Sequence, residues 1–524
     1  MRTSSLVRRS SFVLAWLSLE SVLLSATSLF ALDGERHPGS DEADPLPGEA
    51  GIEASSEVTR AELHHHVAFL ASDELRGRAA ATPDAHRAAR YLARALEAEG
   101  LEPGGNDGFL QHVPLERREH RDLPKLFVTQ VDGTRAELVF GVDFNLSMRG
   151  QPDARRELRL VRVAGEDDLP EAVSRNEAIF LDGSSRKRKA WLAAMGGDPA
   201  GADWGLYVRA GSKKAGRTAA KPRGRLGRKR GEAAANAAQA DPCDVVSLRG
   251  PWREALREGR IERIELALDV VTSEAVDDNV VGVLPGVGTA ERPELANEVI
   301  VFSAHYDHLG VREEGGGAHG DSHEGEDAGD GDEDHVYNGA DDDASGVAAV
   351  LELAQAFARA EPPARTLVFL LAGGEERGLI GTRYYLEHPA RPLSATVCNL
   401  NFEMIGRPDA LSGGRGKLWL TGHERSNLAE AFTRNGLPIS ADMRPEQNFF
   451  RRSDNYAFAE LGIVAQTLSS YDMHKDYHAP SDELETLDFE HLEQGTQVAL
   501  AAARLLAYGT LDPRWLPGGD PTEE

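Results

Sequence analysis

The stretch Tyr337-Asn338-Gly339-Ala340-Asp341-Asp342-Asp343-Ala344-Ser345-Gly346 decides how the rest of this sequence is interpreted. Its three consecutive carboxylates stand just before an Ala-rich apolar pattern, 347–358, that predicts a helix. The free N–H groups of a helix start stabilise one carboxylate, but three adjacent carboxylates repel one another. A bound cation would hold at least one of them inside a protein. Taken alone, the stretch favours a capped, solvated helix start, and only the neighbouring motifs change that interpretation.

Composition excludes some classes of function. The 524 residues are 41% hydrophobic and carry a formal net charge of -28 at pH 7. This length allows a large core and more than one domain, and the charge argues against a nucleic-acid-binding protein. The basic stretches 186–189 and 213–230 lack interleaved aromatic residues, so we interpret them as surface loop. The two cysteines cannot form a disulfide framework, and Cys398, within an apolar run, is predicted to be a buried free thiol.

The N-terminus has the pattern of a targeting segment. Arg2, Arg8 and Arg9 precede the apolar run Phe12–Phe30, so residues 1–31 are predicted to be a signal peptide. Glu20 interrupts that run, which leaves an uncleaved anchor open. Residues 32–58 are rich in Asp, Glu, Gly and Pro and are predicted to be a disordered linker. No other stretch is long and apolar enough to span a bilayer, so we expect a secreted or periplasmic protein.

Strand and helix patterns divide the remaining chain. Helices are predicted from Thr59 and over Asp84–Glu99, and short strand-like runs within 116–275 predict an inserted, mainly β domain. From Asn279, apolar strands alternate with helices. This predicts an α/β fold with a mixed, mostly parallel twisted sheet and helices on both faces, built from 59–115 and 276–510, with 511–524 as a tail. Ligands of such sheets gather outside the carboxyl ends of the strands.

Potential metal ligands follow the predicted strands. His305 ends one strand, and Asp307, two residues on, could orient its ring. Glu375 and Glu376 follow the next strand. Neighbouring side chains of an extended segment point in opposite directions, so one carboxylate can bind a metal while the other acts as a base. Glu403 ends a third strand, where burying a carboxylate without a cation would be costly.

A fourth loop, 471–482, supplies His478, with His474 as its main competitor. Two histidines and three carboxylates fit two divalent cations about 3.5–4 Å apart that share one carboxylate. Mixed nitrogen and oxygen ligands favour zinc over magnesium or calcium. The consecutive His64–His66 would point three ways from a helix and are not predicted to share a metal. The acidic loop 312–336, with its three histidines, could recruit cations or cover the site, but we interpret it as a disordered insertion.

Six motifs, in order, resemble the M28 family of dinuclear zinc peptidases, and among them bacterial secreted aminopeptidases: AHYDH, YNGADDDASG, GGEERGLIGTRYY, NFEMIGR, RSDNYAF and DYHAPSDE. The similarity covers about 279–508, and ELHHHVAFLASDELRGR with AARYLARALEAEGLEPGG resembles the N-terminal helices of the family. Members often carry an insert, frequently a protease-associated domain, at the position of 116–275.

The resemblance implies a role for each motif residue. Asp342 would bridge two Zn²⁺ ions, with Asp341 as its rival for that role. The first ion would also be held by His305 and Glu403, and the second by Glu376 and His478. Glu375 would be the general base. Asp307, which is not a ligand itself, would orient the His305 ring. Tyr477 would hydrogen-bond the substrate carbonyl or pack as an aromatic ring. Glu403 departs from the family, in which Asp is commonest at this position.

The implied function is a secreted zinc-dependent aminopeptidase that acts on peptides, with no nucleic-acid partner and no membrane contact beyond the export signal. The oligomeric state stays open. A carboxypeptidase on the same fold would need a cation for the substrate carboxylate, which Arg407, Arg451 or Arg452 could supply. A glutaminyl cyclase-like acyltransferase uses one zinc, and the presence of both His305 and Glu403 argues against it. A receptor-like module without metals is the remaining alternative, and the intact ligand set argues against that.

Overall fold

A computed structural model describes residues 58–147, 155–170, 176–184, 187–188, 190–191, 206–211, 213, 225–228, 244–311 and 334–523. The predicted signal peptide, nearly all of the predicted linker, most of the basic stretches and most of the acidic loop lie outside these residues. Within them, no helix has both the length and the apolar character needed to cross a bilayer. Cys398 is a buried free thiol, as predicted.

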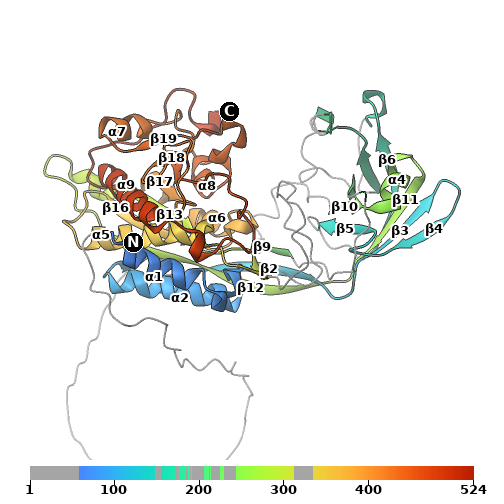
Figure 1. The fold of residues 1–524 in the computed structure, drawn as a ribbon, viewed down its shortest axis with the longest axis horizontal. Coiled ribbons are helices and arrows are strands. Elements are labelled where there is room, and N and C mark those ends of the chain that lie inside the picture. The colour runs from blue at the N-terminus through green and yellow to red at the C-terminus, as the bar shows by residue number, and fades with distance from the viewer. Residues whose placement is uncertain are drawn as a thin grey trace, which may run out of the picture. The chain divides into compact units, whose positions relative to one another are not determined.

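Ten of the described strands form one mixed sheet (Figure 1). In spatial order they are β19 (Ile439–Ala441), β18 (Leu418–Leu420), β20 (Val464–Ser469), β17 (Thr396–Phe402), β13 (Val299–His305), β16 (Thr366–Ala372), β12 (Val270–Leu284), β2 (Leu110–His120) and β9 (Arg225–Arg228), and β1 (Glu102–Pro103) also pairs with β12. The four central strands β20, β17, β13 and β16 are parallel, and β12 runs antiparallel to β16. The fold class is therefore the predicted one.

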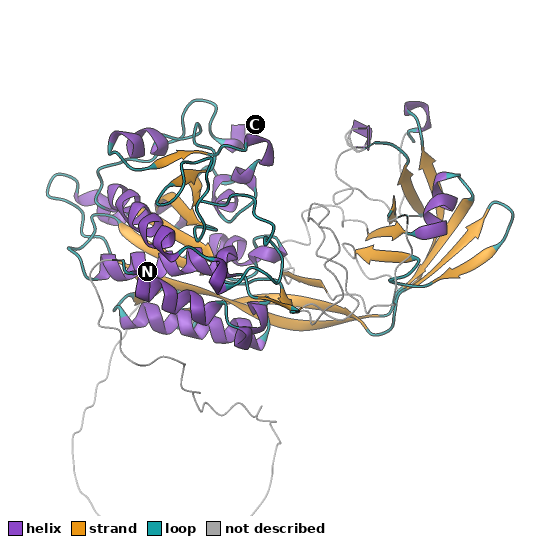
Figure 2. Ribbon diagram, viewed as in Figure 1, coloured by secondary structure: helices purple, strands orange, loops and turns teal. Residues whose placement is uncertain are grey.

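Helices cover both faces of this sheet (Figure 2). One layer contains α1 (Arg60–Leu70), α2 (Pro83–Ala98), α5 (Gly346–Ala358) and α9 (Phe489–Ala507), and the other α6 (Ile380–Glu387) and α8 (Asn455–Ala459); α7 (Leu428–Arg434) packs beside β19. Because successive strand residues face opposite sides, Phe302 stacks on Phe357 of α5, while Val301 packs in the cluster that contains Tyr385 and Phe458. The strands β13 and β16 are buried throughout.

A second sheet is formed by residues between 125 and 267. Its order is β4 (Arg135–Leu138), β3 (Lys125–Gln130), β11 (Ile261–Ala267), β6 (Arg155–Val163), β7 (Glu177–Leu181), β8 (Leu206–Ala210), β10 (Asp244–Leu248) and β5 (Phe144–Ser147). The helix α4 (Gly250–Arg257) contributes Ala255 and Leu256 to its apolar core. The insert is thus mainly β, as predicted.

The borders of the insert run through strands. Residues 110–120 of β2 pair with 270–280 of β12 within the larger sheet. The predicted borders, 116 and 275, fall inside these two strands, so we propose that the inserted domain comprises residues 121–269. The sequence predicts one strand over Ile264–Val271, but two strands share this stretch, since β11 ends at Ala267 and β12 begins at Val270.

Candidate metal centre

Parallel strands bring the predicted ligands to one edge of the larger sheet. His305 ends β13, Glu375 and Glu376 follow β16, and Glu403 follows β17. The loop after β20 carries His478. A small antiparallel pair, β14 (Gly310–Val311) and β15 (Val336–Tyr337), leads from this edge to the three aspartates. The predicted residues therefore meet where parallel strands end.

The three aspartates have two different roles. They lie in a widened turn, Ala340–Ser345, just before α5. Asp341 Oδ1 accepts the backbone N–H of Gly406 at 2.8 Å, and Asp343 Oδ1 accepts those of Gly346 at 3.1 Å and Met404 at 3.0 Å. These two carboxylates fasten the loop after β17. The middle one, Asp342, has extended backbone angles and faces the histidines instead. The geometry therefore favours Asp342 over Asp341 as a ligand.

His305, Asp307 and Glu375 form a connected group. His305 Nε2 lies 3.3 Å from Asp342 Oδ1 and 4.0 Å from Glu375 Oε2. On the other side of the ring, His305 Nδ1 lies 3.1 Å from the backbone carbonyl of Asp307 and 3.8 Å from its carboxylate. That carboxylate accepts the backbone N–H of Glu375 at 2.9 Å. Asp307 was predicted to orient the His305 ring through its side chain, but its carbonyl makes that contact, and its carboxylate positions Glu375.

His478 lies between two carboxylates. Its Nε2 is 3.3 Å from Asp342 Oδ2 and 3.3 Å from Glu376 Oε1. Burial lowers the pKa of His478, but these carboxylates outweigh it and raise that pKa to about 10. Its competitor His474 contacts Asp341 Oδ2 at 3.1 Å, outside this group.

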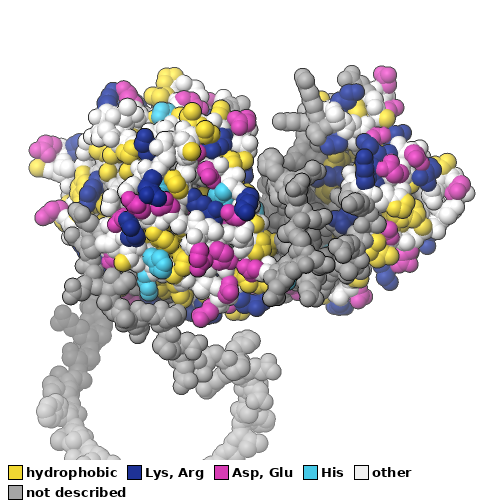
Figure 3. Space-filling view, in the orientation of Figure 1, with side chains coloured by type: hydrophobic (Ala, Val, Ile, Leu, Met, Phe, Trp, Pro, Cys, Tyr) yellow, Lys and Arg dark blue, Asp and Glu magenta, His cyan; other side chains and the backbone are white. Residues whose placement is uncertain are grey.

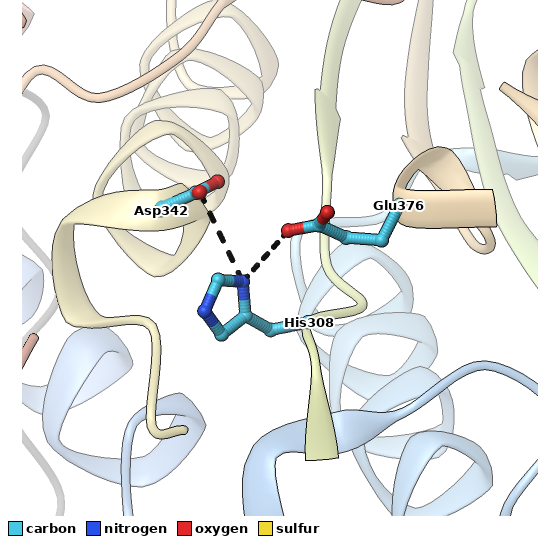
Figure 4. A group of neighbouring side chains, drawn as sticks. All are labelled: His308, Asp342 and Glu376. Atoms are coloured by element: carbon cyan, nitrogen blue, oxygen red, sulfur yellow. Dashed lines mark ion pairs between the residues drawn. The ribbon is translucent and has the colours of Figure 1, made fainter. Parts of the chain in front are cut away.

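One residue in this group was not predicted. His308, three residues beyond His305, places Nδ1 2.9 Å from Glu376 Oε1 and 4.0 Å from Asp342 Oδ2 (Figure 4). Donor atoms of His308, Asp342 and Glu376 all lie within 4.8 Å of one another. The signal in the sequence was a second histidine in AHYDH, but only the fold shows which way it points.

Glu403 lies close to this group without a direct ion pair to any histidine among the described residues. Its Oε2 is buried and accepts no hydrogen bond. Burial raises the pKa of Glu403 to about 8, although the charge of His305 acts in the opposite direction. Burial also raises the pKa of Glu375 well above its ordinary value. Both carboxylates are thus placed where ionisation needs a nearby positive charge.

These residues fit divalent cations. The buried carboxylate of Asp342 and the partly buried ones of Glu375, Glu376 and Glu403 face three imidazoles, and one buried oxygen each of Glu376 and Glu403 has no hydrogen-bond donor among the described residues. Buried carboxylates without partners are costly, and a cation removes that cost. Mixed imidazole and carboxylate donors are those that zinc prefers.

A pocket adjoins Glu403. It is lined by Met404, Trp419, Thr421, Phe449, Arg452, Ser453, Thr467, Ser469, Tyr471 and Tyr477. Tyr477 stacks on His478 with ring centroids 3.9 Å apart, and its hydroxyl lies 3.5 Å from Arg452 Nη2. Arg407 is instead held by Asp476 and Asp482, and Arg451 lies over the Tyr456 ring. Of the three predicted arginines, Arg452 is the one that lines the pocket.

The sequence of this region matches a known family. Residues 279–503 match the model of peptidase family M28. This part of the chain is an M28 peptidase domain. Over 179 residues the chain is 26% identical to Aminopeptidase YwaD of Bacillus subtilis, which covers 31% of this chain and 37% of the relative. Over 205 residues it is 30% identical to Leupeptin-inactivating enzyme 1 of Streptomyces exfoliatus, and this match covers 34% of this chain and 45% of the relative. The chain thus spans less than half the length of these curated relatives.

Solved structures show the same fold. An aminopeptidase from Aneurinibacillus sp. strain AM-1 superposes with a TM-score of 0.54 at 18% identity, covering 86% of this chain and 94% of that one. BSAP, a zinc aminopeptidase from Bacillus subtilis, superposes with a TM-score of 0.52 at 17% identity, covering 90% of this chain and 99% of that one. Both alignments extend well beyond the M28 segment of this chain.

Proposed function

We propose that this protein is an exported zinc-dependent aminopeptidase that removes N-terminal residues from peptides. The observation that carries the proposal is the meeting of His305, Asp342, Glu376, Glu403 and His478 at one sheet edge, in a region that belongs to the M28 family. One curated relative and one solved structure are named as aminopeptidases, and a second solved structure as a zinc aminopeptidase. Export would depend on residues 1–31, which lie outside the described residues.

The distances among His305, Asp342, Glu376 and His478 support the ligand sets that the family resemblance implies. Asp342 faces His305 with one carboxylate oxygen and His478 with the other, which is the arrangement of a bridging carboxylate. Glu403 would complete the set on the His305 side, and Glu376 on the His478 side. When bound, two zinc ions would polarise the scissile carbonyl and lower the pKa of the attacking water.

Glu375 is placed to move the proton. Its Oε2 lies 4.0 Å from His305 Nε2, so it borders the space enclosed by the ligands, and Asp307 fixes its backbone. Glu375 would take a proton from the attacking water and return it to the departing amine. Tyr477, stacked on His478 beside the pocket, would donate its hydroxyl proton to the substrate carbonyl oxygen.

The pocket would receive the side chain of the N-terminal residue. Trp419, Phe449 and Tyr471 give it aromatic walls, which favour apolar side chains. The surrounding carboxylates favour the free ammonium group of a peptide N-terminus over its carboxylate. The aminopeptidase proposal follows from this excess of negative charge.

The test uses aminoacyl chromogenic substrates with and without a chelator, followed by zinc restoration. We expect hydrolysis of leucyl and phenylalanyl substrates, loss of activity on chelation and recovery with zinc. N-acetylation of the substrate should abolish cleavage, because it removes the ammonium group. Equal cleavage of acetylated and free peptides would refute the aminopeptidase proposal.

Arg452 favours a second candidate, a carboxypeptidase, because it brings a guanidinium to the pocket that could bind a substrate carboxylate. Peptides with amidated C-termini separate the two functions. A carboxypeptidase would stop cleaving amidated peptides, whereas the aminopeptidase that we favour would be unaffected.

A further inference from the structure

His308 is a buried imidazole whose nitrogens make no hydrogen bond in the part of the chain that the structure describes. Its side chain is 0% exposed, and neither Nδ1 nor Nε2 has a partner with hydrogen-bond geometry there. Leaving a buried polar group without a hydrogen-bond partner destabilises the fold. A fold that retains such a side chain therefore needs another interaction for it.

The carboxylates near His308 indicate what that interaction is. Nδ1 lies 2.9 Å from Glu376 Oε1, yet the angle is not that of a hydrogen bond, and this oxygen also lacks a donor. The same nitrogen lies 4.0 Å from Asp342 Oδ2. In Figure 4 both dashed lines start from this one nitrogen of the ring, which points between the two carboxylates. Donor atoms bound at about 2.0–2.2 Å to one zinc ion are separated by about 3–4 Å, so these distances suit a shared ion.

The chain makes room for the ring in this orientation. Gly339 has a positive φ of 58°, and a Cβ there would lie 2.7 Å from both Cγ and Cδ2 of His308. The same Cβ would lie still closer to the backbone oxygen of Asp342, so a larger residue at 339 would collide with both the imidazole and the Asp342 backbone. The backbone N–H of His308 also donates to the carbonyl of Arg78 at 3.3 Å. Gly339 thus allows the close approach of the ring, and the bond to Arg78 holds the His308 backbone.

We propose that His308 Nδ1 is an additional ligand of the second zinc ion, together with Asp342, Glu376 and His478. The inference rests on the two-zinc centre proposed above and extends it, because the family resemblance implies only His305 and His478 as imidazole ligands. Three imidazoles would then serve two ions. The second ion would be nearly enclosed by protein and tightly held, whereas the ion on the His305 side would keep the open positions that substrate needs.

The first test counts imidazoles directly. X-ray absorption on the full chain loaded with two zinc ions should fit three imidazoles per two ions, an average of 1.5 per zinc from the proposed ligand sets. Two imidazoles per two ions would overturn the inference while leaving the two-zinc centre intact. A chain that binds no zinc would instead refute the proposed function as well. This measurement requires no variant, so it does not depend on whether a variant folds.

The second test is His308→Ala, with His66→Ala as the matched control. His66 is also a largely buried imidazole, but it contacts Tyr91 and Glu352 instead. Competition with a chromophoric chelator should show that one of the two zinc affinities of His308→Ala falls at least about ten-fold. Cobalt-substituted protein should change its visible spectrum, since a ligand is lost. The control should retain both affinities and the spectrum, and an unchanged His308→Ala would overturn the proposal.

Discussion

Both sheets of this protein contain neighbouring parallel strands, but their charged residues behave differently. In the smaller sheet β6, β7, β8 and β10 are parallel, and charged side chains near their ends form exposed pairs. Arg159 contacts Glu177 at 2.8 Å with 71% of the Arg side chain exposed. Figure 3 shows basic and acidic side chains interspersed over the part of the surface that this sheet forms. In the larger sheet, the strand ends gather carboxylates that are buried.

The difference separates architecture from function. Parallel strand ends supply a common edge, but exposed pairs at such an edge contribute only about 0–1 kcal/mol each and need no ligand. Glu376 and Glu403 are only partly exposed, and each has one buried oxygen without a donor among the described residues, so the desolvation of these carboxylates would cost several kcal/mol. Only the second kind of edge is incomplete without cations.

The largest effect is expected for Glu375→Gln. The amide keeps the shape of the side chain and leaves the N–H bond to Asp307 in place, but it cannot accept a proton. We expect kcat to fall by about 10²–10⁴-fold while the zinc content stays the same. Steady-state kinetics and metal analysis check this together. Glu376→Gln serves as the comparison, since it should lose both zinc and activity, and a fully active Glu375→Gln enzyme would contradict the assigned base.

Arg78 shows how the buried edge is supported. Its guanidinium is fully buried and donates only to backbone carbonyls: those of Tyr306 at 2.7 Å, Asn338 at 2.6 Å, Gly339 at 3.1 Å and Leu70. It thereby joins the segment after His305 to the segment before Asp341. Burial lowers the pKa of Arg78 to about 10, so the group stays charged at neutral pH.

Replacing Arg78, which is not a proposed ligand, should therefore destabilise the metal centre indirectly. In Arg78→Met the carbonyls lose their donor, and we expect the free energy of unfolding to fall by about 3 kcal/mol. Zinc affinity should fall as well, because His305 and Asp342 are no longer held together. Denaturant unfolding and chelator competition measure the two effects. Arg76→Met, at a 64% exposed neighbour, is the control and should change neither.

The central strands and helices could be predicted because their burial is visible in the apolar pattern of each segment. The sequence predicts a strand over Thr366–Ala372 and a helix over Ile380–Glu387, and both elements have these bounds. An unbroken apolar run suits a strand covered on both faces. In contrast, β2 and residues 272–279 of β12 are rich in charged and polar residues and were not predicted as strands. These two strands are stabilised by pairing with each other, which a single sequence does not show.

The sequence predicted which residues form the metal centre better than it predicted the contacts between them. The motifs named His305, Asp342, Glu376, Glu403 and His478, and the structure brings these together. The contacts of Asp307 and the direction of the His308 ring depend instead on backbone positions that neighbouring segments fix, such as Gly339. Such contacts cannot be derived from spacing along the chain.

A pH-dependent contribution to the stability of the fold is expected beside the metal centre, where Asp278 binds two imidazoles. His86 Nδ1 lies 2.8 Å and His112 Nδ1 2.6 Å from its oxygens, which joins α2 and β2 to β12. The hydrogen bond to Asp278 raises the pKa of each histidine above its ordinary value. Burial would raise the pKa of Asp278, but the two histidines outweigh it and lower that pKa.

The directions of these pKa shifts define the pH range in which the contacts of Asp278 stabilise the fold. The histidine contribution is fully present below the ordinary histidine pKa of about 6.5 and is lost as pH rises through the raised values. The Asp278 contribution is present above about 3.9 and is lost as pH falls through the lowered value. Asp278→Asn should thus reduce the unfolding temperature most at about pH 5 and least above neutrality. A pH-independent difference from wild type, measured by calorimetry, would contradict this account.

The smallest effect is expected at the exposed edge of the smaller sheet. Arg159 and Glu177 are register partners on adjacent parallel strands, and solvent screens their interaction because the arginine is largely exposed. In a double-mutant cycle with Arg159→Gln and Glu177→Gln, the coupling energy should be below about 1 kcal/mol and should decrease further in high salt. A larger, salt-resistant coupling would mean that this edge is desolvated in the folded protein. It would then resemble the edge that holds His305 and Asp342, and exposure would no longer distinguish the two sheets.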